Sequence, residues 1–170
     1  MPGSMDEGKV WAREAILSLA PRRILDVGPG IGRYRDLING QLKAEWWGVE
    51  AWAPYVEQFD LTTRYDRIIV ADVRWLDWAS AGRFDLVILG DVLEHMPRAD
   101  ALRVWSLARL HAGHVLLSLP IVPYPQGPEG GNPFEEHVET WTHTEVWALP
   151  GIVSSEAHET VGVYLARGLA

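Results

Sequence analysis

Three glycines at alternate positions near the N-terminus restrict the fold of this chain more than any other feature. Gly28, Gly30 and Gly32 follow a short segment that contains the apolar residues Ile24 and Leu25. Glycine adopts backbone conformations that other residues avoid, and it lets the main chain approach another group closely. A turn of this kind between a strand and a helix predicts a nucleotide-type ligand site at the end of the first strand.

The spacing of these glycines disfavours a dinucleotide ligand. A dinucleotide fingerprint has the pattern G-x-G-x-x-G, and counted from Gly28 its third glycine would stand at position 33. The chain has Arg33 there, and its own pattern from Asp26 to Gly32 is D-x-G-x-G-x-G. The turn therefore predicts a nucleotide-type ligand other than a dinucleotide.

Apolar segments suited to buried strands alternate with segments suited to helices along most of the chain. Strands are expected at 23–27, 45–50, 67–71, 84–90 and 114–119, and an antiparallel hairpin at 153–157 and 161–167. Helices are expected at 6–20, 34–38, 54–59 and 97–110, with a short one at 142–145. This alternation is typical of an α/β fold with a parallel sheet covered on both faces. Ligands of such sheets bind at the carboxyl ends of the strands.

The two longest expected helices each carry an apolar side that predicts burial. On the first helix this side comprises Val10, Trp11, Ala15, Ile16 and Leu19. On the second it comprises Leu102, Trp105, Leu107 and Leu110.

Composition narrows the class of protein further. The length of 170 residues suits one domain, expected to span 6–170, and residues 1–4 are expected to be a remnant of the expression vector. The chain has no cysteine, which excludes disulfides and cysteine-ligated zinc, and a cytoplasmic setting without membrane spans is expected. Its formal net charge of −8 repels phosphate backbones, so nucleic acid is disfavoured as a partner.

Acidic residues stand at the ends of three further strands. Glu50 ends the second strand, Asp72 follows the third, and Asp91 follows the fourth as part of the sequence Gly90–His95. With the D-x-G-x-G-x-G turn, this pattern resembles class I S-adenosylmethionine-dependent methyltransferases, in particular small members of the methyltransferase type 11/12 kind. The resemblance covers nearly the whole chain from Pro21 onward.

The resemblance implies a fold, an activity and a cofactor. The fold is a Rossmann-like three-layer sandwich whose seven-stranded, mostly parallel sheet has the order 3-2-1-4-5-7-6 with an antiparallel last strand. The activity is methyl transfer from S-adenosyl-L-methionine to an acceptor by in-line displacement, with S-adenosyl-L-homocysteine as product. Asp26, Glu50 and Asp91 would provide a negative field that suits the positive charges of this cofactor.

The same resemblance implies which residues bind the cofactor. In its terms, Glu50 accepts the ribose hydroxyls, Asp72 and Val73 meet the adenine, and Trp52 or Trp75 flanks it. Two alternatives stay open: Asp72 caps the segment that follows it, and Asp91 caps the next helix. The expected cofactor-binding residues are Asp26, Gly28, Pro29, Gly30, Gly32, Glu50, Ala51, Asp72, Val73, Gly90 and Asp91.

Two histidines are the candidates for catalysis. His137 is the first candidate for a general base and His95 the second, although each could equally be a structural hydrogen bonder or a substrate contact. A metal held by this pair is disfavoured because no third ligand is evident, so no metal is expected. Trp141 is expected near the substrate side.

The segment 121–141 is expected to cover the substrate, with its glycines allowing it to move as a lid. A small lid over an acidic site favours a small-molecule acceptor. Two other hypotheses stay open: a methyltransferase that acts on nucleic acid or protein, and a non-catalytic module that binds the cofactor or has lost it.

Overall fold

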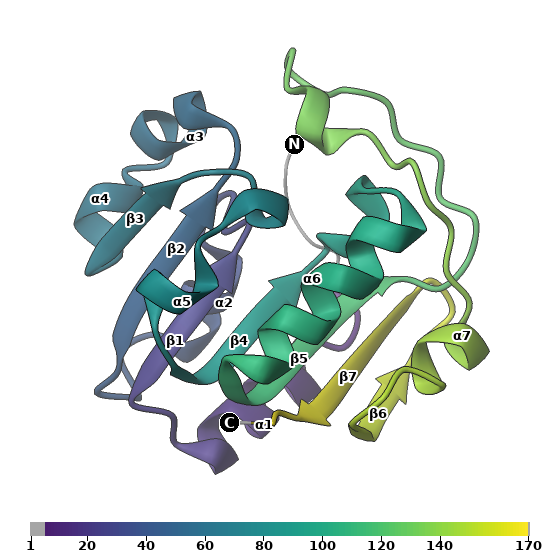
Figure 1. Cartoon of the computed structure of the whole chain (residues 1–170), viewed down its shortest axis with the longest axis horizontal. Helices are drawn as coiled ribbons and strands as arrows, with labels where there is room; N and C mark the ends of the chain where they lie inside the picture. Colours follow the sequence, from purple (N-terminus) through teal and green to yellow (C-terminus); the bar gives the residue numbers. More distant parts are fainter. Residues whose placement is uncertain (1–5, 170) are drawn as a thin grey trace.

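A single mixed sheet forms the centre of the molecule (Figure 1). The computed structural model describes residues 6–169, so the expected vector remnant at 1–4 lies outside the described residues. The strands are β1 Arg23–Val27, β2 Glu45–Glu50, β3 Arg67–Val70, β4 Phe84–Gly90, β5 Ala112–Pro120, β6 Ile152–Ala157 and β7 Val161–Arg167. Their order is β3-β2-β1-β4-β5-β7-β6, in which β7 runs antiparallel to both of its neighbours and all other adjacent pairs are parallel. The predicted strand order and reversed last strand are confirmed.

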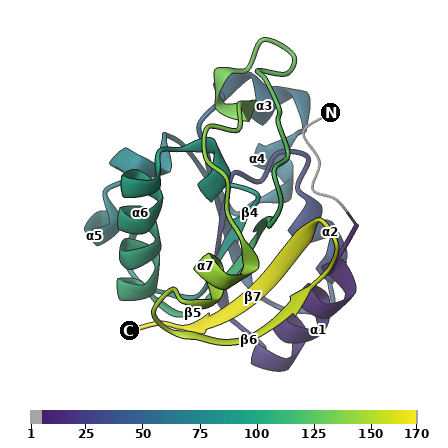
Figure 2. The same cartoon turned by 90° about the vertical axis from the view of Figure 1, so that its right-hand side faces the viewer.

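Helices cover both faces of this sheet, which confirms the predicted three-layer sandwich (Figure 2). Helices α5, α6 and α7 pack on one face, and α1, α2 and α4 pack on the other. The α-helices are α1 Lys9–Leu19, α2 Arg33–Ile38, α3 Ala53–Gln58, α4 Leu61–Arg64, α5 Trp78–Ala81, α6 Arg98–Leu110 and α7 His143–Trp147. Single 3₁₀ turns are η1 Val73–Trp75, η2 Leu93–His95 and η3 Pro133–Glu135.

Strand β4 shows why the central strands are apolar at almost every position. Leu86 and Ile88 point into the core beneath α1 and α2, whereas Val87 and Leu89 point into the core beneath α5 and α6. All four side chains are fully buried, because successive residues of a strand face opposite sides of a sheet that is covered twice.

Helix α1 packs most of its predicted side against the core, since Ile16 is buried there and Trp11, Ala15 and Leu19 are partly buried, but the helix is turned so that Val10 faces water. Its buried residues are Lys9, Ala12 and Ile16, whereas Val10 is 73% exposed. The helix begins only at Lys9, after Gly8 in a left-handed conformation with φ of 70°, and the residues before it belong to a turn. The three buried positions are spaced three and four residues apart and therefore form one face of the helix.

The buried stripe of helix α6 is also turned from the predicted one. Trp105 is buried as predicted, but Leu102 and Leu110 are substantially exposed. The face toward the sheet comprises Ala101, Val104, Trp105 and Ala108. Its two alanines let the helix lie close to the sheet, and a prediction weighted toward large leucines misses such a face.

The C-terminal elements follow their local signals. Thr142 caps α7 in a reciprocal capping box with Glu145, and β6 and β7 form the predicted antiparallel hairpin.

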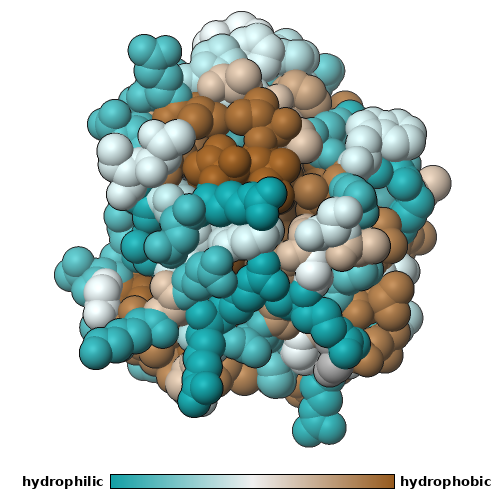
Figure 3. Space-filling view, turned by 60° about the vertical axis from the view of Figure 1, so that its left-hand side comes forward, coloured by the Kyte–Doolittle hydropathy of each residue, from teal (hydrophilic) through white to brown (hydrophobic). Residues whose placement is uncertain are grey.

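At the opposite edge of the sheet, exposed Val70 and half-buried Ile68 and Ile69 belong to β3. Figure 3 brings this side of the molecule forward and shows a hydrophobic patch bordered by hydrophilic residues. Within residues 6–169, the structure contains no helix that is both long and apolar enough for a membrane span.

Two substitutions in α1 test which side of this helix is buried. We expect Ile16→Ala to lower the free energy of unfolding by about 2–5 kcal/mol, because it removes a fully buried side chain. The matched change Val10→Ala should alter it by no more than about 0.5 kcal/mol, because Val10 faces water. Urea unfolding followed by circular dichroism measures both, and equal losses would contradict the observed packing.

Candidate functional site

A cavity of about 390 Å³ opens at the carboxyl ends of β1, β2 and β4, beneath the segment 121–141. The predicted residues that line it are Gly28, Pro29, Gly30, Glu50, Ala51, Asp72, Val73, Gly90, Asp91, His95 and His137. Asp26 and Gly32 do not line it. Most of the predicted site residues therefore line the cavity, and the two exceptions have other roles.

The glycine turn presents its backbone to the cavity. Gly28 has a φ of 63° and donates its N–H to the Val49 carbonyl at 2.8 Å, which joins the turn to the neighbouring strand. A Cβ added at Gly28 would lie 3.1 Å from a methyl group of Val92. Gly30 also has a positive φ of 50°. The turn thus combines left-handed backbone with close packing, as the sequence predicted.

Gly32 is required by packing behind the cavity. It has a φ of 78°, and a Cβ there would lie 2.5 Å from the guanidinium of Arg64. Arg64 donates hydrogen bonds to the carbonyls of Ile31 and Gly32, and it also pairs with Asp36. Gly32 therefore allows an arginine to hold the start of α2, and the predicted contact with the ligand is not seen in the cavity wall.

Asp26 lies behind the turn, where it is buried almost completely. Its Oδ2 accepts a hydrogen bond of 2.7 Å from the Tyr65 hydroxyl. Burial raises the pKa of Asp26 to about 7, although the Tyr65 hydrogen bond acts in the opposite direction. Near neutral pH the residue is therefore protonated in a large fraction of molecules, and its predicted negative field is weaker than that of an ordinary aspartate.

Glu50 is a buried carboxylate in the cavity wall. Its Oε1 accepts a hydrogen bond of 2.8 Å from the Trp52 N–H. Burial raises the pKa of Glu50, and backbone N–H groups, first that of Trp52, oppose this rise. Neither Trp52 nor Trp75 lines the cavity, and Trp75 is 76% exposed, so the predicted flanking tryptophan is wrong. Tyr55 of α3 lines the cavity instead, which the sequence analysis missed.

Asp72 adopts the capping role that the sequence left as an alternative. Its carboxylate accepts the Arg74 N–H at 2.9 Å and pairs with the Arg74 guanidinium at 2.5 Å. Burial acts to raise the pKa of Asp72, but the hydrogen bonds from Arg74 outweigh it and hold this pKa below its ordinary value. Asp72 still lines the cavity, so the cap and a ligand contact do not exclude one another.

A buried lysine lies beside Asp91 at the end of β4. Asp91 has a left-handed φ of 55°, and its Oδ2 is 3.9 Å from the Nζ of Lys9. Lys9 is only 3% exposed and donates hydrogen bonds to Tyr34 and Ser118. Asp91 does not cap the turn η2 that follows. The capping position of η2 is Val92, and no side chain makes a capping hydrogen bond there. The burial of Lys9 was not predicted, since a lysine at the start of a helix is usually exposed.

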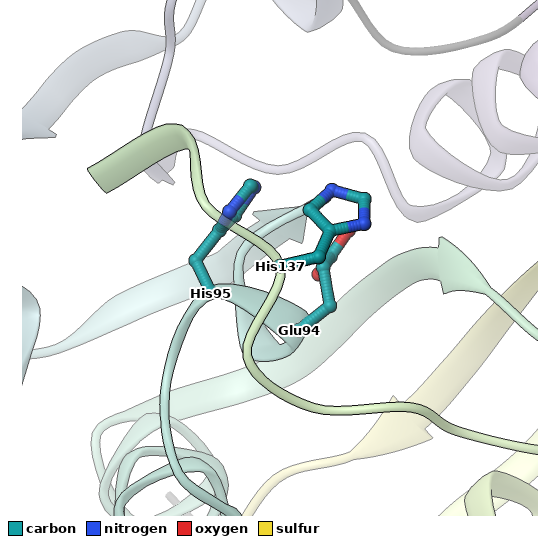
Figure 4. Close-up of side chains that lie close together, drawn as sticks. All are labelled: Glu94, His95 and His137. Carbon is teal, nitrogen blue, oxygen red and sulfur yellow. The ribbon is translucent and has the colours of Figure 1, made fainter. Parts of the chain in front are cut away.

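Glu94, His95 and His137 form a cluster on the cavity wall (Figure 4). Their donor atoms lie within 4.8 Å of one another, and the two imidazole rings are 4.7 Å apart between centroids. Glu94 is 1% exposed, and neither of its carboxylate oxygens makes a hydrogen bond with a described residue. Burial and the charge of Asp91 raise the pKa of Glu94 well above its ordinary value. Burial also lowers the pKa values of both histidines.

The segment 121–141 brings His137 to this cluster. Its two legs run side by side (Figures 1 and 2), joined where the His137 N–H donates to the Gln126 carbonyl at 3.0 Å. The N–H groups of Val138 and Glu139 donate to the Glu94 carbonyl at 2.9 and 3.0 Å. The segment thus forms a wall of the cavity. Trp141 is buried in the core with Arg98 stacked 3.8 Å from its ring, so its predicted place near the substrate is wrong.

The fold and the site together define a class of protein. An open α/β sheet with a glycine turn after β1 and acidic residues after β2, β3 and β4 is a Rossmann-like cofactor-binding architecture. A family model described as a methyltransferase domain matches residues 9–154. The chain belongs to this methyltransferase family.

Solved structures with the same fold are found among methyltransferases. The N-terminal domain of EvdMO1 with SAH bound has a TM-score of 0.71 at 17% identity, covering 97% of this chain and 82% of that one. Magnesium protoporphyrin IX methyltransferase from Synechocystis PCC 6803 with bound SAH has a TM-score of 0.69 at 17% identity, with coverages of 95% and 82%. An S-adenosylmethionine-dependent methyltransferase from Clostridium acetobutylicum ATCC 824 has a TM-score of 0.70 at 12% identity, with coverages of 94% and 89%. A comparison with curated proteins gives no significant match.

The raised pKa of Asp26 predicts a specific dependence of stability on pH. Between 3.8, the value of an unburied aspartate, and about 7, the folded state holds more protons at Asp26 than the unfolded state does. The contribution of Asp26 to the free energy of unfolding is therefore full below this window and is lost as the pH rises through it. Asp26→Asn, which does not titrate, should become more stable relative to the wild type from about pH 4 to about pH 7, and the difference should then level off.

Urea unfolding at a series of pH values measures this difference. Exposed Asp60→Asn serves as the control and should run parallel to the wild type across the same range. A wild type that runs parallel to Asp26→Asn would rule out the raised pKa.

Proposed function

We propose that this chain uses S-adenosyl-L-methionine to methylate a small-molecule acceptor. The observation that carries the proposal is one continuous cavity lined both by the cofactor-type residues of the strand ends and by the cluster of Glu94, His95 and His137. A cofactor and an acceptor bound in a shared cavity can be held with their reacting atoms adjacent. Such alignment contributes several kcal/mol or more to catalysis of a displacement.

The residues of the cavity fit the cofactor. Glu50 offers a buried carboxylate at the end of β2, where the ribose hydroxyls of a nucleoside would lie. A ligand can approach the backbone at Gly28 and Gly30, because no Cβ intervenes. Two similar structures, the EvdMO1 domain and the protoporphyrin enzyme, have SAH bound. We assign adenine recognition to Asp72 and Val73, and recognition of the methionine part to Gly90 and Asp91.

His137 and His95 are the proposed catalytic residues. When bound, the cofactor supplies a methyl group on a sulfonium that is ready for in-line displacement. The His137 Nδ1 lies 2.7 Å from the Tyr124 carbonyl, so Nδ1 carries the proton and Nε2 keeps a lone pair. His95 is oriented similarly by the Glu136 carbonyl at 3.1 Å. Each ring therefore has a nitrogen with a lone pair to serve an acceptor that must lose a proton.

The nature of the acceptor is the finer part of this proposal. The net charge of −8 weighs against nucleic acid, and the restricted volume beneath 121–141 suits a small molecule better than a protein. The complete set of strand-end residues weighs against a module that has lost its cofactor. One methyltransferase domain over 6–170 and a cytoplasmic setting remain part of the proposal.

Glu50→Gln tests the cofactor assignment. We expect this change to weaken binding of S-adenosyl-L-methionine and S-adenosyl-L-homocysteine by about 10- to 100-fold, because it weakens charge-assisted hydrogen bonds to the ribose. Isothermal titration calorimetry with either ligand gives the affinities. Exposed Glu57→Gln on α3 is the matched control and should bind as the wild type does. Unchanged affinity in a folded Glu50→Gln protein would refute this role of Glu50.

Methyl-labelled cofactor identifies the class of acceptor. The wild-type protein is incubated with it and with separated metabolite, nucleic-acid and protein fractions of a lysate. We expect the label to appear in the metabolite fraction. Label in one of the other fractions would overturn the small-molecule assignment, and failure to bind the cofactor at all would favour the non-catalytic module.

His137→Ala tests the catalytic assignment, with the lysate fraction that takes up the label as the source of acceptor. We expect turnover to fall by about 10²–10⁴-fold, the usual contribution of a group that handles a proton, while affinity for S-adenosyl-L-homocysteine stays unchanged. Release of S-adenosyl-L-homocysteine measures turnover. Exposed His158→Ala, on the β6–β7 hairpin, should leave turnover intact. Wild-type turnover by His137→Ala would remove His137 from the mechanism.

A further inference from the structure

We infer that Glu94, His95 and His137 bind a divalent transition-metal ion. The three residues come from two parts of the chain that meet only in the folded protein. Glu94 and His95 belong to η2, the turn that follows β4, whereas His137 lies in the segment 121–141 (Figure 4). Their donor atoms lie within 4.8 Å of one another. Metal–ligand bonds of about 2.0–2.2 Å require the donors to approach more closely, so binding of an ion requires the side chains to rotate toward it.

The backbone holds these donors together. The Glu94 carbonyl accepts hydrogen bonds from the N–H groups of Val138 and Glu139, directly after His137. This contact fixes the register of the segment against η2. The cluster is therefore built by the fold, and it differs from a chance meeting of exposed side chains.

Both imidazoles are oriented as metal ligands are. The Nδ1 of His95 faces the Glu136 carbonyl at 3.1 Å, and the Nδ1 of His137 faces the Tyr124 carbonyl at 2.7 Å. A carbonyl oxygen only accepts hydrogen bonds, so each Nδ1 is the donor and, in the neutral ring, Nε2 carries the lone pair. Histidine ligands of metals typically donate their other ring nitrogen to a carbonyl or carboxylate in this way.

Glu94 provides the independent sign that a cation belongs here. Its side chain is 1% exposed and lines the cavity, yet neither carboxylate oxygen makes a hydrogen bond with a described residue. The Oδ2 of neighbouring Asp91 also makes none. Lys9 is the nearest cation to Asp91, but its Nζ lies 3.9 Å away and donates to Tyr34 and Ser118. The other oxygen of Asp91 accepts a hydrogen bond from Ser118, so the carboxylate of Glu94 is the one that is buried without a partner. A buried carboxylate of this kind is costly, and a metal ion would stabilise it.

The donor set indicates the kind of ion. Two imidazoles and one carboxylate suit Zn²⁺, Mn²⁺, Fe²⁺ or Co²⁺, whereas Mg²⁺ and Ca²⁺ prefer oxygen ligands alone. Three protein ligands also leave coordination positions open toward the cavity. An ion at this site could therefore bind an acceptor molecule directly.

The ion gives the cluster a chemical role that rests on the proposed function. It would bind the hydroxyl oxygen of an acceptor and favour loss of its proton to water. The oxygen then forms a bond to the methyl carbon while the carbon–sulfur bond breaks and its electron pair stays on sulfur. In this mechanism His95 and His137 act as metal ligands in place of accepting the proton themselves, and the acceptor is an alcohol or a phenol.

Direct metal binding tests the inference without any acceptor. Tag-free protein is stripped with a chelator and titrated with Mn²⁺, Co²⁺, Zn²⁺ and, as a comparison, Mg²⁺. Calorimetry, Mn²⁺ electron paramagnetic resonance and the visible spectrum of Co²⁺ report binding. We expect one transition-metal ion per chain and a higher melting temperature on binding. Glu94→Gln and His137→Ala should each weaken binding by at least about 10- to 100-fold, since loss of even an outer-shell partner costs that much.

Two variants keep the test independent of folding. Glu94→Gln replaces a buried carboxyl group that has no hydrogen-bond partner by a neutral group of the same shape, so its metal-free melting temperature should equal or exceed that of the wild type while the metal-induced rise disappears. His158→Ala, a remote exposed histidine, should bind as the wild type does. Absence of binding by the folded wild type, preference for Mg²⁺ alone, or undiminished binding by Glu94→Gln would each overturn the inference.

The outcomes also separate this inference from the proposed function. Metal binding with no methyl transfer to any fraction keeps the metal site and refutes the function. Methyl transfer that survives the chelator, by protein that binds no transition metal, keeps the function and refutes the metal site.

Discussion

The parallel pairing of β1 with two neighbours is the constraint on which the whole site depends. In the sheet, Val27 is in register with Val49 of β2 and with Leu89 of β4. The residue that follows each of these, namely Gly28, Glu50 and Gly90, therefore comes to the same edge of the sheet. Ladder hydrogen bonds and the burial of both faces hold this register, because a shift by one residue would turn each strand's side chains to the opposite face. The cavity is thus a consequence of strand pairing before any ligand is considered.

Features that follow from local pattern could be predicted from the sequence. The strand ends, the glycine turn and the hairpin rest on contiguous residues whose chemistry is specific to one conformation, and these predictions are confirmed. The face of α6 could not be predicted from size alone, because Ala101 and Ala108 pack against the sheet while Leu102 faces water. Whether an alanine or a leucine meets the sheet depends on how closely the helix approaches, which is a tertiary property.

Within the site, too, the residues placed by local structure could be predicted, and those placed by contacts between distant segments could not. Glu50 lines the cavity because the end of its strand determines its place, whereas Asp26 points behind the turn to Tyr65, a partner 39 residues away. Glu94, which joins His95 and His137 in the cluster on the cavity wall, was not predicted from the sequence for a related reason. Metal-ligand spacing in sequence presumes neighbouring turns of one helix, but here η2 and a distant segment contribute the donors. Contacts between distant segments leave no periodic trace in a single sequence.

The segment 121–141 is held by hydrogen bonds near both of its ends and is open at its tip. One end is held where the Ile121 N–H donates to Thr160, and the other where Val138 and Glu139 donate to Glu94. Between these points Gly130 and Gly131 form a tip where an added Cβ would meet no atom within 4 Å. The tip therefore has room for added side chains and inserted residues, although the φ values of 58° and 81° favour glycine at these two positions. A lineage of such proteins could acquire new acceptors by changing this tip alone, while the chemistry beneath it stays the same.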